Sequence, residues 1–199
     1  QTCALPILTG FPSDCDRLLL ATGGYRPTTE VFGHTIEPPV PSLFTFHVAG
    51  WSDLAGITVD AEVSAAGRTE RGPVLFTHTG LSGPAILRLS AWRARELHAL
   101  NYRFPLTVKW LEVDFDRMRR EHGAKLIANT PLLPARLWER LAPNVRWSKL
   151  TSAEQTAFEQ RLTRTELLVT GKSPNKEEFV TCGGVRLSEV NFKTMESKL

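Results

Sequence analysis

The strongest constraint on the fold is a change of hydrophobic period along the chain. Three segments before residue 111 alternate apolar with polar side chains, which is typical of strands with one buried face. From 114 to 164 the apolar residues recur at helical spacing, and 167–170 returns to strand-like sequence. This order predicts an α+β protein in which one domain is inserted into another. The alternating segments are 44–48, 57–63 and 102–110.

Local signals refine these elements. Pro105 lacks a backbone N–H, so its strand is expected at a sheet edge or at a bulge. Pro84 is expected in the first turn of one helix, whose apolar stripe includes Trp92 and Leu100. The residues from Thr151 to Glu154 fit a capping box, which predicts the start of another helix. The proline-rich segment 37–41 predicts an extended connector and a domain boundary.

Composition excludes several classes of protein. The net charge of +3 is weakly basic, which permits a polyanionic partner without indicating one. No segment approaches the roughly 18 consecutive apolar residues of a membrane span, so no membrane partner is expected. The three cysteines form no CxxC pair, which argues against a disulfide framework and favours the cytoplasm. We find no metal-binding motif, no GxGxxG fingerprint and no Walker A loop.

Two segments place glycine pairs after strand-like sequence. The segments are 18–24 (LLLATGG) and 181–185 (TCGGV). Glycines at a strand end let the backbone approach a phosphate or a ring closely, although a plain tight turn has the same pattern. Cys182 fits either a redox thiol or, with no second cysteine nearby, a small packing residue.

A third segment, 76–84 (FTHTGLSGP), precedes the helix expected at Pro84. Backbone N–H groups there can hold an anion or a polarised carbonyl, and His78 can exchange a proton near neutral pH. The alternative is a structural turn in which the histidine packs or caps. A group of arginines fits either phosphate contacts or an ordinary exposed helix face. These arginines are Arg93, Arg95, Arg117, Arg119 and Arg120.

Together these segments resemble the BaiN/RdsA-type FAD-dependent oxidoreductases, bacterial NAD(P)- and FAD-dependent flavoproteins, over nearly the whole chain. The most specific match is residues 178–199 (EFVTCGGVRLSEVNFKTMESKL), followed by 76–92 (FTHTGLSGPAILRLSAW). The other matches are 18–24 and 33–46 (GHTIEPPVPSLFTF). Two departures stand out. The family's N-terminal GxGxxG and C-terminal glycine-rich flavin segments are missing, and the stretch from Gly24 to Gly33 is shorter than in the family.

The resemblance implies a multidomain fragment. A β-barrel-like insert with a helical subdomain would be flanked by short pieces of a Rossmann-like FAD-binding domain. The first seven residues look like a translated sequencing adapter, so we expect an internal piece of a longer enzyme. The expected parts are an artefact at 1–7, an FAD-domain flank at 8–40, the β-rich insert at 41–112, the helical subdomain at 113–165, and the return to the FAD domain at 166–199.

The resemblance also implies site residues and chemistry. The catalytic candidates are His78 and Thr77, at a turn expected to face a substrate cleft between the domains. The FAD-binding candidates are Ala21, Thr22, Gly23, Gly24, Thr181, Cys182, Gly183 and Gly184. The substrate-side candidates are Gly80, Leu81, Ser82 and Gly83. The implied activity is reduction of a conjugated C=C bond with FAD and NAD(P)H, in a ribosomal RNA uridine or in a small unsaturated carbonyl compound.

Two other hypotheses remain from the residues alone. The region can be an RNA-docking module that uses the arginine group, or a domain with a purely structural role. With its phosphate-binding loop absent, the chain by itself is expected not to retain FAD and to be inactive.

Overall fold

The computed structural model describes residues 17–19, 32–172 and 180–199, and these form two compact units. One unit is Val40–Cys182. The other combines residues up to Pro39 with Gly183–Leu199. Among the described residues, no helix has both the length and the apolar character required to cross a membrane.

The larger unit is built on a closed barrel of six antiparallel strands, in the order β2-β5-β4-β3-β6-β7. In the central strands every second side chain is buried, as the alternation predicts: Val59, Ala61 and Val63 face the interior, and Leu106 and Val108 do the same. The strands are β2 (Phe46–Val48), β3 (Thr58–Ala65), β4 (Arg68–Phe76), β5 (Gly80–Ser82), β6 (Phe104–Lys109) and β7 (Thr165–Lys172).

The expectation for Pro105 was wrong: it lies neither on an edge strand nor at a bulge, because β6 pairs with both β3 and β7 in the closed barrel. It lies opposite Leu168 in the β6–β7 pair, whereas the β3–β6 pairing covers only residues from Thr107 to Lys109. On the β3 side, Pro105 therefore stands beyond the ladder, where a missing N–H costs no strand pairing.

Two other sequence expectations for this half of the chain were wrong. The helix expected from Pro84 is two helices, α1 (Pro84–Trp92) and α2 (Ala94–Ala99), separated at Arg93. Trp92 and Leu100, which were expected on the apolar stripe, are 63% and 47% exposed, and the Trp92 ring contacts the Arg68 guanidinium at 4.4 Å instead of the core. Strands β4 and β5 were not expected, since charges and Gly72-Pro73 obscure the alternation in β4.

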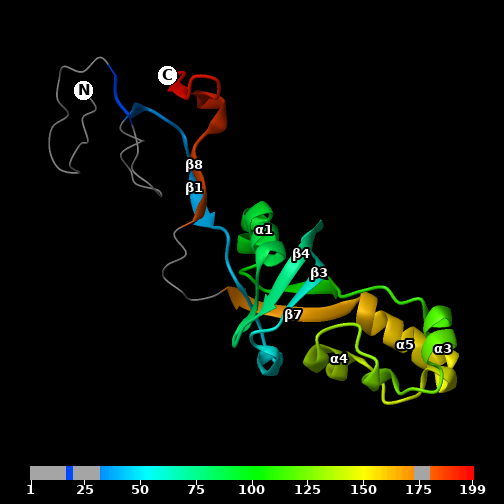
Figure 1. Ribbon diagram of the computed structural model, residues 1–199. Helices are drawn as coiled ribbons and strands as arrows, with labels where there is room; N and C mark the ends of the chain where they lie inside the picture. The colour runs from blue at the N-terminus through cyan, green and yellow to red at the C-terminus, as the bar shows by residue number, and fades with distance from the viewer. Residues whose placement is uncertain (1–16, 20–31, 173–179) are drawn as a thin grey trace. The chain divides into compact units, whose positions relative to one another are not determined.

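A group of helices is inserted between β6 and β7, which pair directly with each other. Its helices are α3 (Phe115–His122), α4 (Ala135–Leu141) and α5 (Ser152–Thr163), and they gather near the start of β7 (Figure 1). The predicted capping box is confirmed: Thr151 accepts a hydrogen bond from the Glu154 N–H, and Glu154 accepts one from the Thr151 N–H.

An aromatic cluster forms the core of this helical part. Phe158 lies within 5.7–6.4 Å, centroid to centroid, of Phe115, Trp138 and Trp147. The indole of Trp138 donates to the Ile127 carbonyl at 2.8 Å, and that of Trp147 donates to Thr130 Oγ1 at 2.7 Å. The buried indoles thus keep their hydrogen bonds. This core is continuous with the barrel core, so the two parts form one unit.

The smaller unit has little regular structure. Strands β1 (Ile36–Pro41) and β8 (Thr181–Val185) form a two-stranded sheet. A hairpin of β9 (Val190–Asn191) and β10 (Glu196–Ser197) follows. Hydrogen bonds from Arg186 N to Thr35 O and from Ser42 N to Val180 O flank the β1–β8 pair, which shows that it is antiparallel. The chain therefore leaves and re-enters the larger unit through neighbouring strands.

Candidate functional site

The segment around His78 is a tight turn between β4 and β5. Thr77 closes it: its backbone N–H donates to the Gly80 carbonyl at 2.8 Å, and its hydroxyl accepts from the Gly80 N–H at 3.0 Å. His78 is exposed and has no hydrogen bond or ion pair with the described residues. The turn thus holds the backbone firmly while leaving both ring nitrogens of His78 available.

The neighbouring glycines have packing roles. A Cβ on Gly80 would clash with the Phe46 carbonyl oxygen, and one on Gly83 would lie 2.8 Å from that of Pro73. Leu81 is fully buried in the barrel core, and the Ser82 hydroxyl accepts a hydrogen bond from Thr45 Oγ1 at 3.1 Å. Close strand packing therefore explains the two glycines and Leu81, whereas their role on a substrate remains a prediction.

The glycine pair in β8 separates into two environments. A Cβ on Gly183 would lie 2.8 Å from both the Pro38 carbonyl oxygen and the Pro39 Cα in β1. At Gly184, which has φ +117°, a Cβ would meet nothing within 4 Å. Gly183 is thus fixed by strand packing, while Gly184 presents open backbone. Thr181 is exposed and Cys182 is a partly buried free thiol. The candidates Ala21, Thr22, Gly23 and Gly24 lie outside the described residues.

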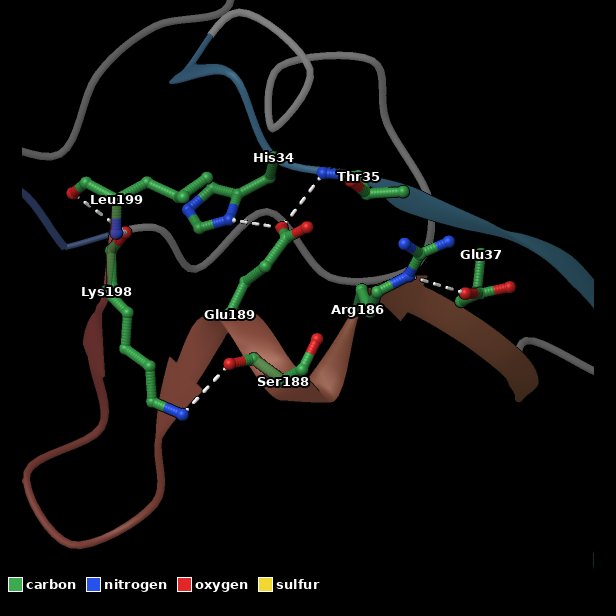
Figure 2. Close-up of polar contacts among 9 residues, drawn as sticks. His34, Thr35, Glu37, Arg186, Ser188, Glu189, Lys198 and Leu199 are labelled. Atoms are coloured by element: carbon green, nitrogen blue, oxygen red, sulfur yellow. Dashed lines mark hydrogen bonds and ion pairs between the residues drawn. The ribbon is translucent and has the colours of Figure 1, made fainter.

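A polar cluster in the smaller unit escaped the sequence-based predictions. Glu189 Oε2 lies 3.0 Å from His34 Nδ1 and accepts the Thr35 N–H at 2.9 Å, as Figure 2 shows. Arg186 pairs with Glu37 at 3.0 Å, and Lys198 Nζ donates to the Ser188 carbonyl at 2.9 Å (Figure 2). His34 and Glu189 are 155 positions apart, so no local pattern could have paired them.

The Glu189 carboxyl is electrostatically favoured in its ionised form. Hydrogen bonding from Thr35, through side chain and backbone, holds the pKa of Glu189 below its usual value, and His34 lowers this pKa further. The side chains of His34 and Glu189 are only 7% and 15% exposed. The cluster therefore ties the segment before β1 to the segment after β8.

The arginines singled out from the sequence are largely occupied. Arg117 pairs with Glu121 at 2.9 Å and Arg93 with Glu96 at 2.7 Å. Arg119 pairs with Asp116 at 3.3 Å and donates to Gln155 at 2.5 Å. For Arg93, Arg117 and Arg119 these contacts favour the structural interpretation.

A different set of arginines lines a groove of about 580 Å³ in the larger unit. The groove lies between the turn that carries Trp51, helices α4 and α5, and the start of β7. Its lining residues are Trp51, Arg140, Leu141, Ala157, Gln160, Arg161, Arg164, Thr165 and Glu166. Sequence reasoning missed it because Trp51, Arg140 and Arg164 lie in separate elements.

The architecture defines a class: an α+β protein in which a closed barrel, interrupted by a helical part, is inserted through a two-stranded connector. Residues 40–180 match the family model described as "HI0933-like protein barrel and H2TH domain". The chain therefore belongs to the HI0933-like family.

Two curated relatives extend this comparison. The chain is 32% identical over 216 residues to a "Ribosomal RNA dihydrouridine synthase" of Escherichia coli (strain K12), with 96% of the chain and 53% of the relative covered. It is 25% identical over 207 residues to a protein of the same name from Haemophilus influenzae (strain ATCC 51907 / DSM 11121 / KW20 / Rd), covering 92% and 51%. The chain spans about half the length of these relatives.

Proposed function

We propose that this chain is part of an FAD-dependent oxidoreductase that reduces a uridine C=C bond in ribosomal RNA. The observation that carries the proposal is the 32% identity, across 96% of the chain, to a ribosomal RNA dihydrouridine synthase. Between the two substrate classes considered from the sequence, this similarity favours RNA over a small unsaturated carbonyl compound.

The backbone of β8 fits a flavin on one point: Gly184 has open space where any other residue would place a Cβ. We propose that Thr181, Cys182, Gly183 and Gly184 lie against FAD, with Ala21–Gly24 as the second contact segment. FAD, reduced by NAD(P)H, supplies the hydride chemistry.

The residues of the turn would serve the substrate. Hydride addition to one carbon of the uracil C=C bond places negative charge on the conjugated carbonyl oxygen. The other carbon of that bond must then receive a proton. His78 is proposed to supply this proton, because its imidazole is exposed and has no partner among the described residues. Thr77 positions His78 by closing the turn.

The test uses the full-length gene product with its flavin. His78→Ala is expected to leave flavin reduction by NAD(P)H near normal and to slow flavin reoxidation by ribosomal RNA about 10²–10⁴-fold. His98→Ala is the matched control, since His98 is an exposed histidine on α2. Equal reoxidation rates in wild type and His78→Ala would remove His78 from the mechanism. Failure of the wild type to form dihydrouridine in ribosomal RNA would overturn the proposed function itself.

A further inference from the structure

We propose that the groove between the Trp51 turn and α5 holds the phosphate backbone of the RNA substrate. This inference rests on the proposed function, and it assigns RNA docking to a surface of the larger unit. The groove lies wholly within that unit, so its shape follows from one continuous core.

The charge of the groove fits a polyanion. Its described lining includes three arginines, Arg140, Arg161 and Arg164, against one carboxylate, Glu166. Guanidinium groups suit phosphate oxygens because they donate paired N–H groups in one plane. Gln160 adds an uncharged donor next to Arg161 in the sequence. A backbone phosphate that enters this groove meets mostly donors.

Arg140 forms the fixed side of the groove. Its guanidinium lies 4.1 Å from the Trp51 ring centroid, bonds both carboxylate oxygens of Asp53 at 2.9 and 3.1 Å, and donates to the Gly50 carbonyl at 2.5 Å. Asp53 offsets much of the positive charge of Arg140, so Arg140 contributes more to the shape of the groove than to its charge. The Trp51 ring is itself covered by Arg140 and stacked on Phe76, which leaves it a supporting rather than a base-stacking role.

Arg161 and Arg164 lie on the side of the groove where guanidinium groups are available to bind phosphate. Arg161 is exposed and has no ion pair or side-chain hydrogen bond with the described residues; its guanidinium lies 5.8 Å from the Phe158 ring centroid. Arg164 meets Glu166 at 3.3 Å with side chains 72% and 63% exposed. Such exposed pairs contribute little stability, so Arg164 can exchange this carboxylate for a phosphate. Both residues line the groove, Arg161 in the last turn of α5 and Arg164 directly after its end.

This arrangement contrasts with the arginines on α3. Arg117 and Arg119 hold carboxylates of their own helix, Glu121 and Asp116, and line no described part of the groove. The α3 surface is therefore the suitable internal control for non-specific loss of positive charge.

The experiment measures binding of the full-length protein to a fluorescein-labelled fragment of large-subunit ribosomal RNA, by anisotropy over a salt series. The double variant Arg161→Gln/Arg164→Gln is expected to bind on the order of 10-fold more weakly at 0.1 M salt, with the slope of log K against log salt reduced by about 1.4. Arg117→Gln/Arg120→Gln removes the same charge from α3, where Arg120 is exposed and outside the described groove lining, and is expected to change the affinity by less than about 2-fold.

A third variant changes binding in the opposite direction. Glu166→Gln removes the carboxylate of the described groove lining and releases Arg164, so it is expected to tighten binding. A fold defect would not tighten binding, so this variant separates docking from structural damage.

The outcomes separate the two proposals. If the wild type binds the RNA and forms dihydrouridine while the Arg161/Arg164 variant binds equally well, the groove is not the docking site and the proposed function stands. If the α3 variant loses affinity instead, docking belongs to α3. If the wild type neither binds nor reduces ribosomal RNA, both proposals are overturned.

Discussion

The two units of this chain each join segments that are far apart in sequence, but by different means. The barrel unit buries a continuous set of aliphatic and aromatic side chains, many of them fully inaccessible. The smaller unit relies on polar contacts such as Glu189 with His34 and Thr35, while many of its large apolar side chains are exposed. These exposed side chains include Leu187, Phe192, Met195 and Leu199. Hydrophobic burial should therefore dominate stability in the first unit, and hydrogen bonding and charge in the second.

The largest expected effect tests this contrast with one substitution in each unit. Phe158→Ala removes a fully buried ring from the aromatic cluster and is expected to cost about 3–5 kcal/mol of unfolding free energy. Phe192→Ala removes a ring that is 61% exposed and is expected to change stability by no more than about 0.5 kcal/mol. Urea unfolding followed by tryptophan fluorescence measures the first loss, and hydrogen exchange of the Arg186 amide, which bonds Thr35 O, measures the second. Similar losses for the two variants would break the comparison.

The second prediction concerns close strand packing in the smaller unit. Gly183→Ala places a carbon 2.8 Å from backbone atoms of β1, which is expected to cost about 1–3 kcal/mol locally. Gly184→Ala is the matched control, because both glycines have positive φ but only Gly183 meets a neighbour. Hydrogen exchange of the Arg186 amide, which bonds Thr35 O at 2.9 Å, reports the loss. Equal exchange in both variants would show that the clash is relieved without opening the sheet.

The third prediction returns to the larger unit. Thr151→Ala removes the N-cap of α5 and is expected to destabilise the protein by about 1 kcal/mol. Thr156→Ala, on the same helix, removes only a hydroxyl that donates to the Ser152 carbonyl, and is expected to be close to neutral. Thermal unfolding of both variants measures the difference. An equal loss would indicate that the capping box contributes nothing beyond helix propensity.

Sequence alone predicted the parts of the fold that rest on local patterns. The alternation in β3 and β6 and the capping box of α5 each need only a few neighbouring residues to be recognised, and the structure confirms them. Strand β4 carries several charged residues, so its own sequence does not show the alternation of a half-buried strand. Its burial follows from pairing with β3 in the barrel. Helical spacing placed Trp92 on the apolar stripe. Its contact with Arg68, which is distant in sequence, could not be foreseen from that spacing.

The candidate site was predictable to a smaller extent. The turn around His78 was found because its unusual residues are adjacent, but the packing roles of Gly80 and Gly183 emerge only when β2 and β1 are placed beside them. The Trp51–Arg140 groove and the Glu189 cluster both join residues more than 80 positions apart. Pairings of that kind are set by the barrel closure and by the β1–β8 connection, which no single segment encodes.

The smallest expected effect tests whether charge and hydrogen bonding stabilise the smaller unit. The pKa of Glu189 lies below its ordinary value of 4.5, first through Thr35 and then through His34. Because the folded pKa is depressed, the stabilisation is fully present above the unfolded pKa and is lost as pH falls through the folded pKa. The Thr35 amide shift, followed by NMR between pH 7 and acid, is therefore expected to titrate with a midpoint below 4.5. His34→Gln should move this midpoint up only slightly, because Thr35 is the larger cause. In Glu189→Gln the transition should disappear. A midpoint at or above the ordinary value in the wild type would show that the cluster does not stabilise the carboxylate, and would remove the electrostatic account of the smaller unit.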